Sequence, residues 1–531
     1  MNTKNPLLFL ILSLCITSAL ASSQRPNVLL VVADDLGYTD LGSFGGEIQT
    51  PNLDALAQSG MRLTQFYTAA TCSPTRAMLM TGTDHHRVGL GTMAEALAPN
   101  QRGKPGYEGF LNDRAAFLPK AFADAGYRTL MSGKWHLGLD EQHSPAAKGF
   151  QQSFALLDGG AGHFSDLGID KMHASFRENG KPAQLPKDFY SSRFYTDKMI
   201  DYIDSGKNSG QPFFGYLAYT APHWPLQAPD DSIKKYQGHY AMGYDQLHQE
   251  RVENAKSLGL APQNATTAPR QPGQKAWREL SSEEQKIEQR KMEIYAAMVD
   301  DMDRNFGRLL IYLQETGQFD NTIIFFMSDN GAEGATLEDG VFKKFVPHVQ
   351  QCCDNSYENL GKPDSYLFYG PNWARASVGP ARDFKGDITE GGIHSPAFIV
   401  YPGMKERGSI SQQFVSVKDV LPTLLNLANI PLPVDQEVAV EGHSLFTEAG
   451  NTAAMGWELF GGKAYRYGEW KLVRKSPRMG ETQWQLFNLV DDPMEQQDLS
   501  AQQPAKFQQL MQRWADYEQG NGIIYPQRPS H

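Results

Sequence analysis

The apolar positions of the chain fall into short runs that are typical of buried strands. Residues 27–33 read Asn-Val-Leu-Leu-Val-Val-Ala, as expected for a strand that is covered on both faces of a sheet. Further runs with this character are 128–131, 212–219, 322–327 and 396–401. The pattern therefore predicts a sheet whose strands are largely buried.

Helical periodicity separates these runs. Thr50 and Pro51 are residue types that begin a helix, and Gly60 is a type that ends one. Apolar residues keep a helical spacing over 292–313, and Gly317 follows them. Because strands alternate with helices, we predict an α/β fold with a mainly parallel sheet flanked by helices.

The C-terminal part of the chain has a different pattern. Short runs separated by turns predict a small antiparallel sheet, and a closing helix is predicted over 505–519. The runs are 457–460, 464–467, 470–473 and 484–489. We predict a main α/β domain over 24–430 and a C-terminal subdomain over 431–531. The polar stretch 249–290 is predicted to be a surface insertion.

The N-terminus predicts export. Lys4 precedes a short apolar stretch over 7–20, and Ala19-Leu20-Ala21 is a small-x-small cleavage site, so we predict a signal peptide over 1–21. A membrane anchor or a buried helix is the alternative, but the stretch is short for a span. No later segment is long and apolar enough to span a bilayer. We expect a periplasmic or secreted protein with no membrane attachment after the signal is removed.

Composition and charge narrow the classes of function. The chain has 531 residues, of which 40% are hydrophobic and 21% charged, which excludes a disordered protein and allows a large core. The formal net charge of −11 argues against non-specific nucleic-acid binding. An anionic substrate would therefore need a local cationic pocket or a metal ion.

The cysteines raise a separate question. Cys15 lies in the predicted signal peptide, which leaves three cysteines in an oxidising compartment. The adjacent Cys352 and Cys353 are consistent either with a vicinal disulfide or with two thiols. Cys72 then has no partner. Alone, it is consistent with a small buried apolar residue or with a thiolate nucleophile.

Polar clusters follow four of the predicted strands. Because ligands bind beyond the carboxyl ends of strands in open parallel sheets, we expect these clusters to meet at one edge. The clusters are Asp34-Asp35, Gly133-Lys134-Trp135-His136, Ala221-Pro222-His223-Trp224-Pro225 and Ser328-Asp329-Asn330-Gly331. Alone, each of these clusters is more often a turn, a helix cap, a solvated loop charge or a packed histidine than part of a site. Together they indicate a functional site.

Four residues of these clusters have the chemistry of a cation site. They are Asp34, Asp35, Asp329 and Asn330. They offer only oxygen ligands, which suit Ca²⁺ or Mg²⁺ rather than zinc. Because three buried carboxylates would repel one another, we expect that a cation is required if they converge.

The segment Cys72-Ser73-Pro74-Thr75-Arg76 carries a family signature. It reads as the start of a helix that Gly82 ends, with Cys72 at the N-terminus, and it matches the C-x-P-x-R motif of the sulfatase family. The resemblance continues through 79–82, 133–138, 221–225 and 328–331 and covers nearly the whole mature chain. The runs 83–86 and 92–97 are similar to those of bacterial arylsulfatases. The fold that the resemblance implies is that of the alkaline phosphatase superfamily.

The resemblance also implies a cofactor and residue roles. In this family a formylglycine-generating enzyme oxidises the signature cysteine, here Cys72, to Cα-formylglycine. The implied Ca²⁺ ligands (Mg²⁺ fits less well) are Asp34, Asp35, Asp329, Asn330 and residue 72. The other implied catalytic residues are Arg76, Lys134, His136, His223 and Lys385, of which Lys134, His223 and Lys385 also bind substrate. Lys385 is identified through the resemblance alone, since by itself it would be interpreted as a surface lysine.

The implied activity is arylsulfatase-type hydrolysis of a small-molecule or carbohydrate sulfate ester, which releases inorganic sulfate and an alcohol or phenol. The hydrated aldehyde would attack sulfur, and Asp329 would help to deprotonate the attacking hydroxyl. His223 and Lys385 would protonate the leaving oxygen. His136 would then assist the release of sulfate. Two alternatives stay open: a phosphoester or phosphonate hydrolase of the same superfamily, and a non-catalytic protein that binds sulfated glycans.

Overall fold

The computed structural model describes residues 25–338, 342–447, 454–477 and 483–527. The predicted signal peptide lies outside these residues. None of the described helices is both long and apolar enough to cross a membrane.

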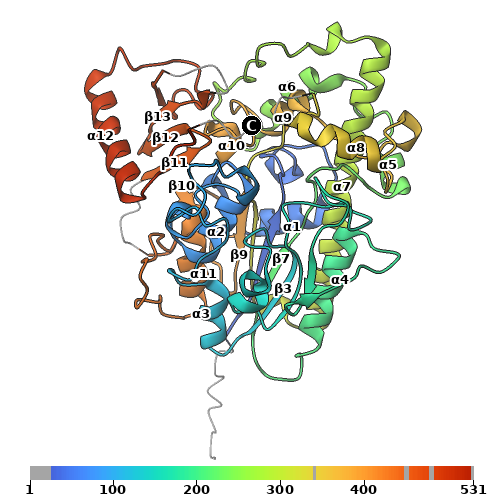
Figure 1. Cartoon of the computed structure of the whole chain (residues 1–531), viewed down its shortest axis with the longest axis vertical. Helices are drawn as coiled ribbons and strands as arrows, with labels where there is room; N and C mark the ends of the chain where they lie inside the picture. Colours follow the sequence, from blue (N-terminus) through green and yellow to red (C-terminus); the bar gives the residue numbers. More distant parts are fainter. Residues whose placement is uncertain (1–24, 339–341, 448–453, 478–482, 528–531) are drawn as a thin grey trace, which may run out of the picture.

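A large, mainly parallel sheet organises the described chain (Figure 1). Its strands are β1 Asn27–Ala33, β2 Met61–Tyr67, β3 Arg128–Lys134, β4 Gln152–Leu156, β5 Phe176–Glu178, β6 Lys181–Pro182, β7 Phe213–Ala218, β8 Thr322–Ser328, β9 Ala397–Val400 and β10 Ser409–Ser416. Their order across the sheet is β10-β2-β9-β8-β1-β7-β3-β4-β5-β6. The central strands β8, β1, β7 and β3 are parallel neighbours, which confirms the predicted architecture.

Helices cover both faces of the sheet (Figure 1). They are α1 Pro51–Ser59, α2 Cys72–Thr81, α3 Leu118–Asp124, α4 Ser191–Asp204, α5 Asp230–Lys235, α6 Gly243–Ser257, α7 Ser282–Glu315, α8 Val346–Cys352, α9 Pro371–Ser377, α10 Glu390–Ile393 and α11 Val420–Leu427. α1, α4 and α7 pack together on one face, whereas α2, α3 and α11 lie on the other.

Strand β1 shows why the predicted strands are apolar throughout. Leu29 and Val31 belong to the core beneath α4 and α7, while Val28, Leu30 and Val32 belong to the core on the opposite face. Since successive side chains of a strand point to opposite faces, a sheet covered on both sides requires apolar residues at every position.

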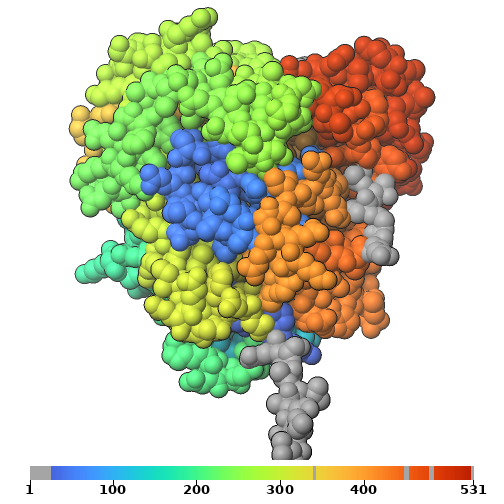
Figure 2. Space-filling view, turned by 180° about the vertical axis from the view of Figure 1, so that it is seen from behind, coloured from blue at the N-terminus to red at the C-terminus, as the bar shows by residue number. Residues whose placement is uncertain are grey.

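A second, antiparallel sheet follows in the C-terminal part. It consists of β11 Ala454–Leu459, β12 Gly462–Tyr467, β13 Trp470–Arg474 and β14 Gln485–Asn488, in that order. One face packs on the main core through Trp457 and Val473, and the other packs against α12, Pro504–Gly520, around Trp514. These residues form the red lobe at one side of Figure 2.

The structure corrects the prediction for residues 249–290. The whole stretch is predicted to be a surface insertion, but its first part, up to Ser257, belongs to α6, which is partly buried. Its Arg251 is 1% exposed and forms ion pairs with Asp40 and Glu47. Arginine is usually exposed, and the sequence does not show that Arg251 is buried and paired. The contact of α6 with the core was therefore not predicted.

Candidate active site

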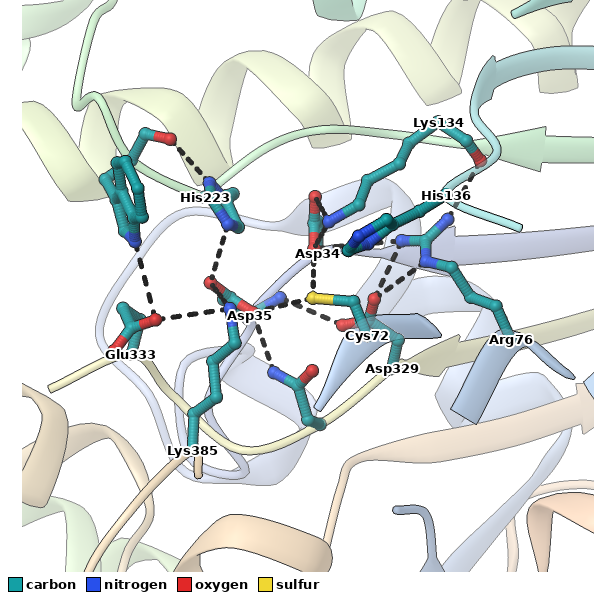
Figure 3. A network of polar contacts seen from close by, with 12 residues as sticks. Asp34, Asp35, Cys72, Arg76, Lys134, His136, His223, Asp329, Glu333 and Lys385 are labelled. Atoms are coloured by element: carbon teal, nitrogen blue, oxygen red, sulfur yellow. Dashed lines mark hydrogen bonds and ion pairs between the residues drawn. The ribbon is translucent and has the colours of Figure 1, made fainter. Parts of the chain in front are cut away.

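The four polar clusters meet at one edge of the sheet, as expected (Figure 3). Parallel strands β1, β3, β7 and β8 end side by side, so the residues that follow them are brought together. Helix α2 begins at the same edge with Cys72, and its C-cap Gly82 is left-handed at φ 67°. Lys385 reaches the site from the loop before α10.

Three carboxylates and three basic groups pair at this edge. The pairs are Lys134 with Asp34, Arg76 with Asp329 and Lys385 with Asp35, each with a shortest N–O distance of 2.8 Å. The side chains of Lys134 and Arg76 are fully buried, and that of Lys385 is 8% exposed. These ion pairs offset part of the repulsion between the three carboxylates.

The donor set nevertheless fits a hard cation. Asn330 donates from Nδ2 to Asp35 Oδ1 at 2.7 Å, and its own Oδ1 is buried with no hydrogen-bond partner among the described residues. A buried acceptor without a donor is costly unless something else binds it. Ligand atoms of Asp34, Asp35, Cys72 and His223 also lie within 4.8 Å of one another. The carboxylate oxygens of Asp34 and Asp35 and the amide oxygen of Asn330 are the type of ligand that Ca²⁺ and Mg²⁺ prefer.

Cys72 lies against the same carboxylates. Its Sγ is 3.5 Å from Asp34 Oδ1 and 3.8 Å from Asp35 Oδ1, and the residue is 1% exposed. Burial, together with the negative charge of Asp329, raises the pKa of the Cys72 thiol well above its ordinary value. The unmodified side chain is therefore a neutral thiol, which is a weak nucleophile.

His223 has a defined tautomer. Its Nδ1 lies 2.5 Å from the carbonyl oxygen of Trp224, which only accepts, so Nδ1 carries the proton. Nε2 then faces Asp35 Oδ2 at 3.6 Å. Burial lowers the pKa of His223 well below its ordinary value, and the positive charge of Lys385 lowers it further.

His136 contacts a residue that the sequence did not single out. Its Nε2 lies 3.1 Å from Oε1 of Glu95, and its Nδ1 is buried with no hydrogen-bond partner among the described residues. Glu95 lies within the run 92–97 that resembles bacterial arylsulfatases, and this resemblance is the signal by which it could have been found. Burial lowers the pKa of His136.

Two site residues have an unusual backbone conformation. Asp35 has φ 68° and His136 has φ 58°, in the left-handed region that side chains disfavour. The conformation of Asp35 is supported by a hydrogen bond from its backbone N to Asp329 Oδ1, at 3.2 Å. Strain of this kind concentrates at functional sites, where it aims a side chain.

A pocket of about 910 Å³ opens over Cys72. His136, His223 and Lys385 line its floor. One wall is aromatic and is formed by Trp224, Phe342 and Phe345. Cys352 and Cys353 form a vicinal disulfide in the structure, and it packs against this aromatic cluster.

The opposite rim of the pocket contains paired charges. Lys275 pairs with Glu284 and Lys291 pairs with Glu288. Each of these two lysines therefore has a carboxylate partner.

Comparison with known proteins agrees with this geometry. The family model described as Sulfatase matches residues 26–430. The chain belongs to the sulfatase family. It is 44% identical to an uncharacterised sulfatase of Schizosaccharomyces pombe over 95% of each chain. It is also 41% identical to the arylsulfatase of Klebsiella aerogenes, over 77% of this chain and 88% of the other. The chain is thus a sulfuric ester hydrolase.

Solved structures share the fold. One is Ps i-CgsB in complex with k-i-k-neocarrahexaose, with a TM-score of 0.66, 25% identity, and coverage of 96% of this sulfatase and 95% of that chain. Another is the phosphonate monoester hydrolase of Agrobacterium radiobacter, with a TM-score of 0.56, 19% identity, and coverage of 94% and 96%. These similarities confirm the expected α/β fold.

Proposed function

We propose that this sulfatase hydrolyses aryl sulfates with a Cα-formylglycine made from Cys72. The observation that carries the proposal is the position of Cys72, within 4 Å of two carboxylates and at the floor of a pocket lined by basic groups. Hydrated formylglycine would supply the oxygen that attacks sulfur, and its return to the aldehyde would release sulfate. An unmodified thiol or hydroxyl lacks that second step.

We propose Ca²⁺ as the metal, with Mg²⁺ fitting less well. Asp34, Asp35, Asp329, Asn330 and residue 72 would hold it. When bound, the cation would offset negative charge on the sulfate oxygens and lower the pKa of a hydroxyl beside it. The flexible set of carboxylate and amide oxygens suits Ca²⁺ better than the strict octahedron of Mg²⁺.

The basic residues would recognise the charged end of the ester. A metal bound to Asp34 and Asp35 would weaken the ion pairs of these carboxylates with Lys134 and Lys385. The two ammonium groups would then be available to the sulfate oxygens. Fixed charges in a buried site stabilise a developing anion more strongly than charges in water. Arg76 would hold Asp329 and residue 72 in place rather than contact the substrate.

The proton transfers would involve four residues. Asp329 would help to take the proton of the attacking hydroxyl. Lys385, which is charged, would donate to the leaving oxygen, with Nε2 of His223 as the second group beside it. His136 would accept the proton of the remaining hydroxyl as sulfate leaves, and Glu95 would stabilise the charged imidazole that results.

The pocket favours an aromatic leaving group. Trp224, Phe342 and Phe345 form a wall beside His223, where a planar ring has a stacking surface. A carbohydrate ester is the alternative, because the similar Ps i-CgsB is solved with a carbohydrate.

The modification of Cys72 is testable by mass. Protein from the natural host, digested and measured as intact peptides, should carry an aldehyde at residue 72 in place of the thiol. The Cys72→Ala variant should fold with an unchanged melting temperature and have no turnover. An unmodified cysteine in active protein, or wild-type rates in Cys72→Ala, would contradict the formylglycine mechanism.

A substrate panel tests the specificity. We expect aryl sulfates to be cleaved with higher kcat/KM than sulfated sugars, and aryl phosphates to be cleaved slowly. Faster cleavage of aryl phosphate would favour a phosphoester hydrolase instead. We also propose that the protein is exported to the periplasm or secreted, which agrees with its disulfide, since disulfides persist in oxidising compartments.

A further inference from the structure

Glu333 is a carboxylate in the active site to which the steps above assign no role. It lies three residues after Asn330, in the loop that follows β8. Its side chain is 13% exposed and lines the pocket together with Lys385 and Trp224. Figure 3 shows Glu333 beside Lys385.

The carboxylate of Glu333 is fixed by three contacts. Oε1 accepts a hydrogen bond from the backbone N of Ala335 at 3.0 Å. Oε2 lies 3.2 Å from Lys385 Nζ and accepts a hydrogen bond from Trp224 Nε1 at 3.4 Å. The first contact belongs to its own loop, so the carboxylate is already held when it meets the other two. It therefore connects the charged end of the site to the aromatic wall.

The backbone around Glu333 keeps these distances short. The backbone N of Lys385 donates to the carbonyl oxygen of Ala332 at 3.0 Å. A Cβ at Gly334 would lie 2.3 Å from the ring of Phe384, so only glycine lets the two loops approach this closely. The loop that carries Asp329 and the loop that carries Lys385 are thus packed directly together, with Glu333 at the junction.

Lys385 has two carboxylate partners, and they differ in what else they do. Asp35 lies 2.8 Å from Nζ but belongs to the set that would hold the cation. Glu333 lies outside that set. When Asp35 is engaged by a cation, Glu333 is the partner that still fixes the flexible lysine side chain. A lysine held on one side keeps its remaining N–H groups directed to the pocket.

We propose that Glu333 is a positioning residue that holds Lys385 against the leaving oxygen and holds the indole of Trp224 against the leaving group. This inference rests on the proposed sulfate ester hydrolysis. The contribution of Glu333 to kcat should therefore increase with the pKa of the leaving phenol. A leaving phenol of high pKa needs a well-placed proton donor, whereas 4-nitrophenol departs readily without one.

The test is a leaving-group series with Glu333→Gln. The amide retains an acceptor for Ala335 or Trp224 and loses the charge that holds Lys385. We expect kcat to fall about 10-fold to 100-fold for phenyl sulfate, because small misplacements of a catalytic group have effects of that size. The loss should be smaller for 4-nitrophenyl sulfate, so that kcat depends more steeply on the pKa of the phenol than in the wild type.

A double mutant separates positioning from a general structural role. In a Lys385→Ala background, Glu333→Gln should change kcat for phenyl sulfate little, because the group that it positions is absent. Glu333→Asp keeps the charge and should restore part of the steep loss. Trp224→Phe keeps an aromatic ring at this position but removes the indole N–H. It should therefore change KM for aryl sulfates more than kcat.

The outcomes are distinguishable from failure of the proposed function. If the wild type cleaves no sulfate ester, the function itself is wrong. If the wild type is active and Glu333→Gln has the wild-type dependence on leaving-group pKa, the positioning role is overturned. An equal loss of kcat with and without Lys385 would overturn it as well. The melting temperature of each variant identifies losses that arise from unfolding.

Discussion

Lys134 carries a fully buried charge in the site. Its Nζ lies 2.8 Å from both oxygens of Asp34, and neither side chain is exposed to solvent. Burial would lower the pKa of Lys134, but the charge of Asp34 outweighs it and holds the pKa above its ordinary value. The lysine is therefore positively charged at neutral pH.

Replacing Lys134 by Met should lower kcat/KM for aryl sulfates about 100-fold to 1,000-fold, the range found when one preorganised electrostatic contact to a transition state is removed. Steady-state kinetics with a melting curve would measure it. Lys120→Met is the matched control, because Lys120 is 64% exposed and pairs only with Asp124. A wild-type rate for Lys134→Met would exclude the proposed role.

At the scale of residues, chemistry at strand ends was predictable. Asp34, Asp329 and their neighbours follow apolar runs, so topology alone brings them together. Glu333 was not found in this way, because a single glutamate in a loop has no pattern that distinguishes it from a solvated charge. Glu95 does not follow a strand either, and only its place in the run 92–97 marks it. The roles assigned to the site residues stay predictions until variants are measured.

Among the elements, β13 has a direct link to the loop that carries Lys385. Lys471 on β13 is fully buried and lies 2.7 Å from Glu390 and 2.9 Å from Glu495. Glu390 begins α10, directly after that loop. The C-terminal sheet thus helps to fix the segment that carries a proposed catalytic lysine.

The Lys471→Met variant should lose about 3–5 kcal/mol of unfolding free energy, since one partner of a buried ion pair is removed and two carboxylates remain. Urea denaturation would measure the loss, and kcat should fall as the Lys385 loop loosens. Lys207→Met, at a side chain that is 48% exposed, should change neither quantity. An unchanged denaturation midpoint for Lys471→Met would contradict this link.

His86 lies shortly after α2 and contacts Glu458 on β11. Its Nδ1 lies 2.8 Å from Asp84 and its Nε2 lies 3.3 Å from Glu458. Burial alone would lower the pKa of His86, but the hydrogen bonds to Asp84 and Glu458 outweigh it and raise the pKa to about 9. The imidazole is therefore charged at neutral pH.

This shift predicts a pH dependence of stability. Because the folded pKa exceeds the ordinary value of 6.5, the stabilisation is complete below about pH 6.5 and is lost as the pH rises through 9. The difference amounts to about 3 kcal/mol. Urea unfolding at both ends of this range should show the loss in the wild type but not in His86→Asn. His173→Asn, at a side chain that is 77% exposed, should behave as the wild type.

At the scale of elements, the sequence predicted the central strands and the closing helix α12, but not the start of α7 or the direction of β9. α7 begins at Ser282, ten residues before its apolar pattern, because its first turns are polar and stabilised by the Ser281–Glu284 capping box. β9 runs antiparallel to β8 and β2, and strand direction has no signal in an apolar run.

For the molecule as a whole, a bound ion would connect the ends of β1 and β8 at the centre of the sheet. Since it would bind the folded chain and not the unfolded one, stability should rise with its concentration, by about 2.7 kcal/mol at a hundred times Kd. Prolonged incubation with a chelator should lower both activity and melting temperature, and Ca²⁺ should restore both. Unaffected activity would show that the metal assignment is wrong. Asn330→Ala should reduce the response to Ca²⁺.

The packing of the C-terminal sheet on the main core has a practical consequence for expression of this protein. A fragment that stops at residue 430, where the family match ends, would leave behind Trp457, Leu459 and Val473 and bare the apolar surface that they cover. Glu390 would also lose Lys471. We expect such a truncated fragment to aggregate, so recombinant work should retain both sheets in one polypeptide.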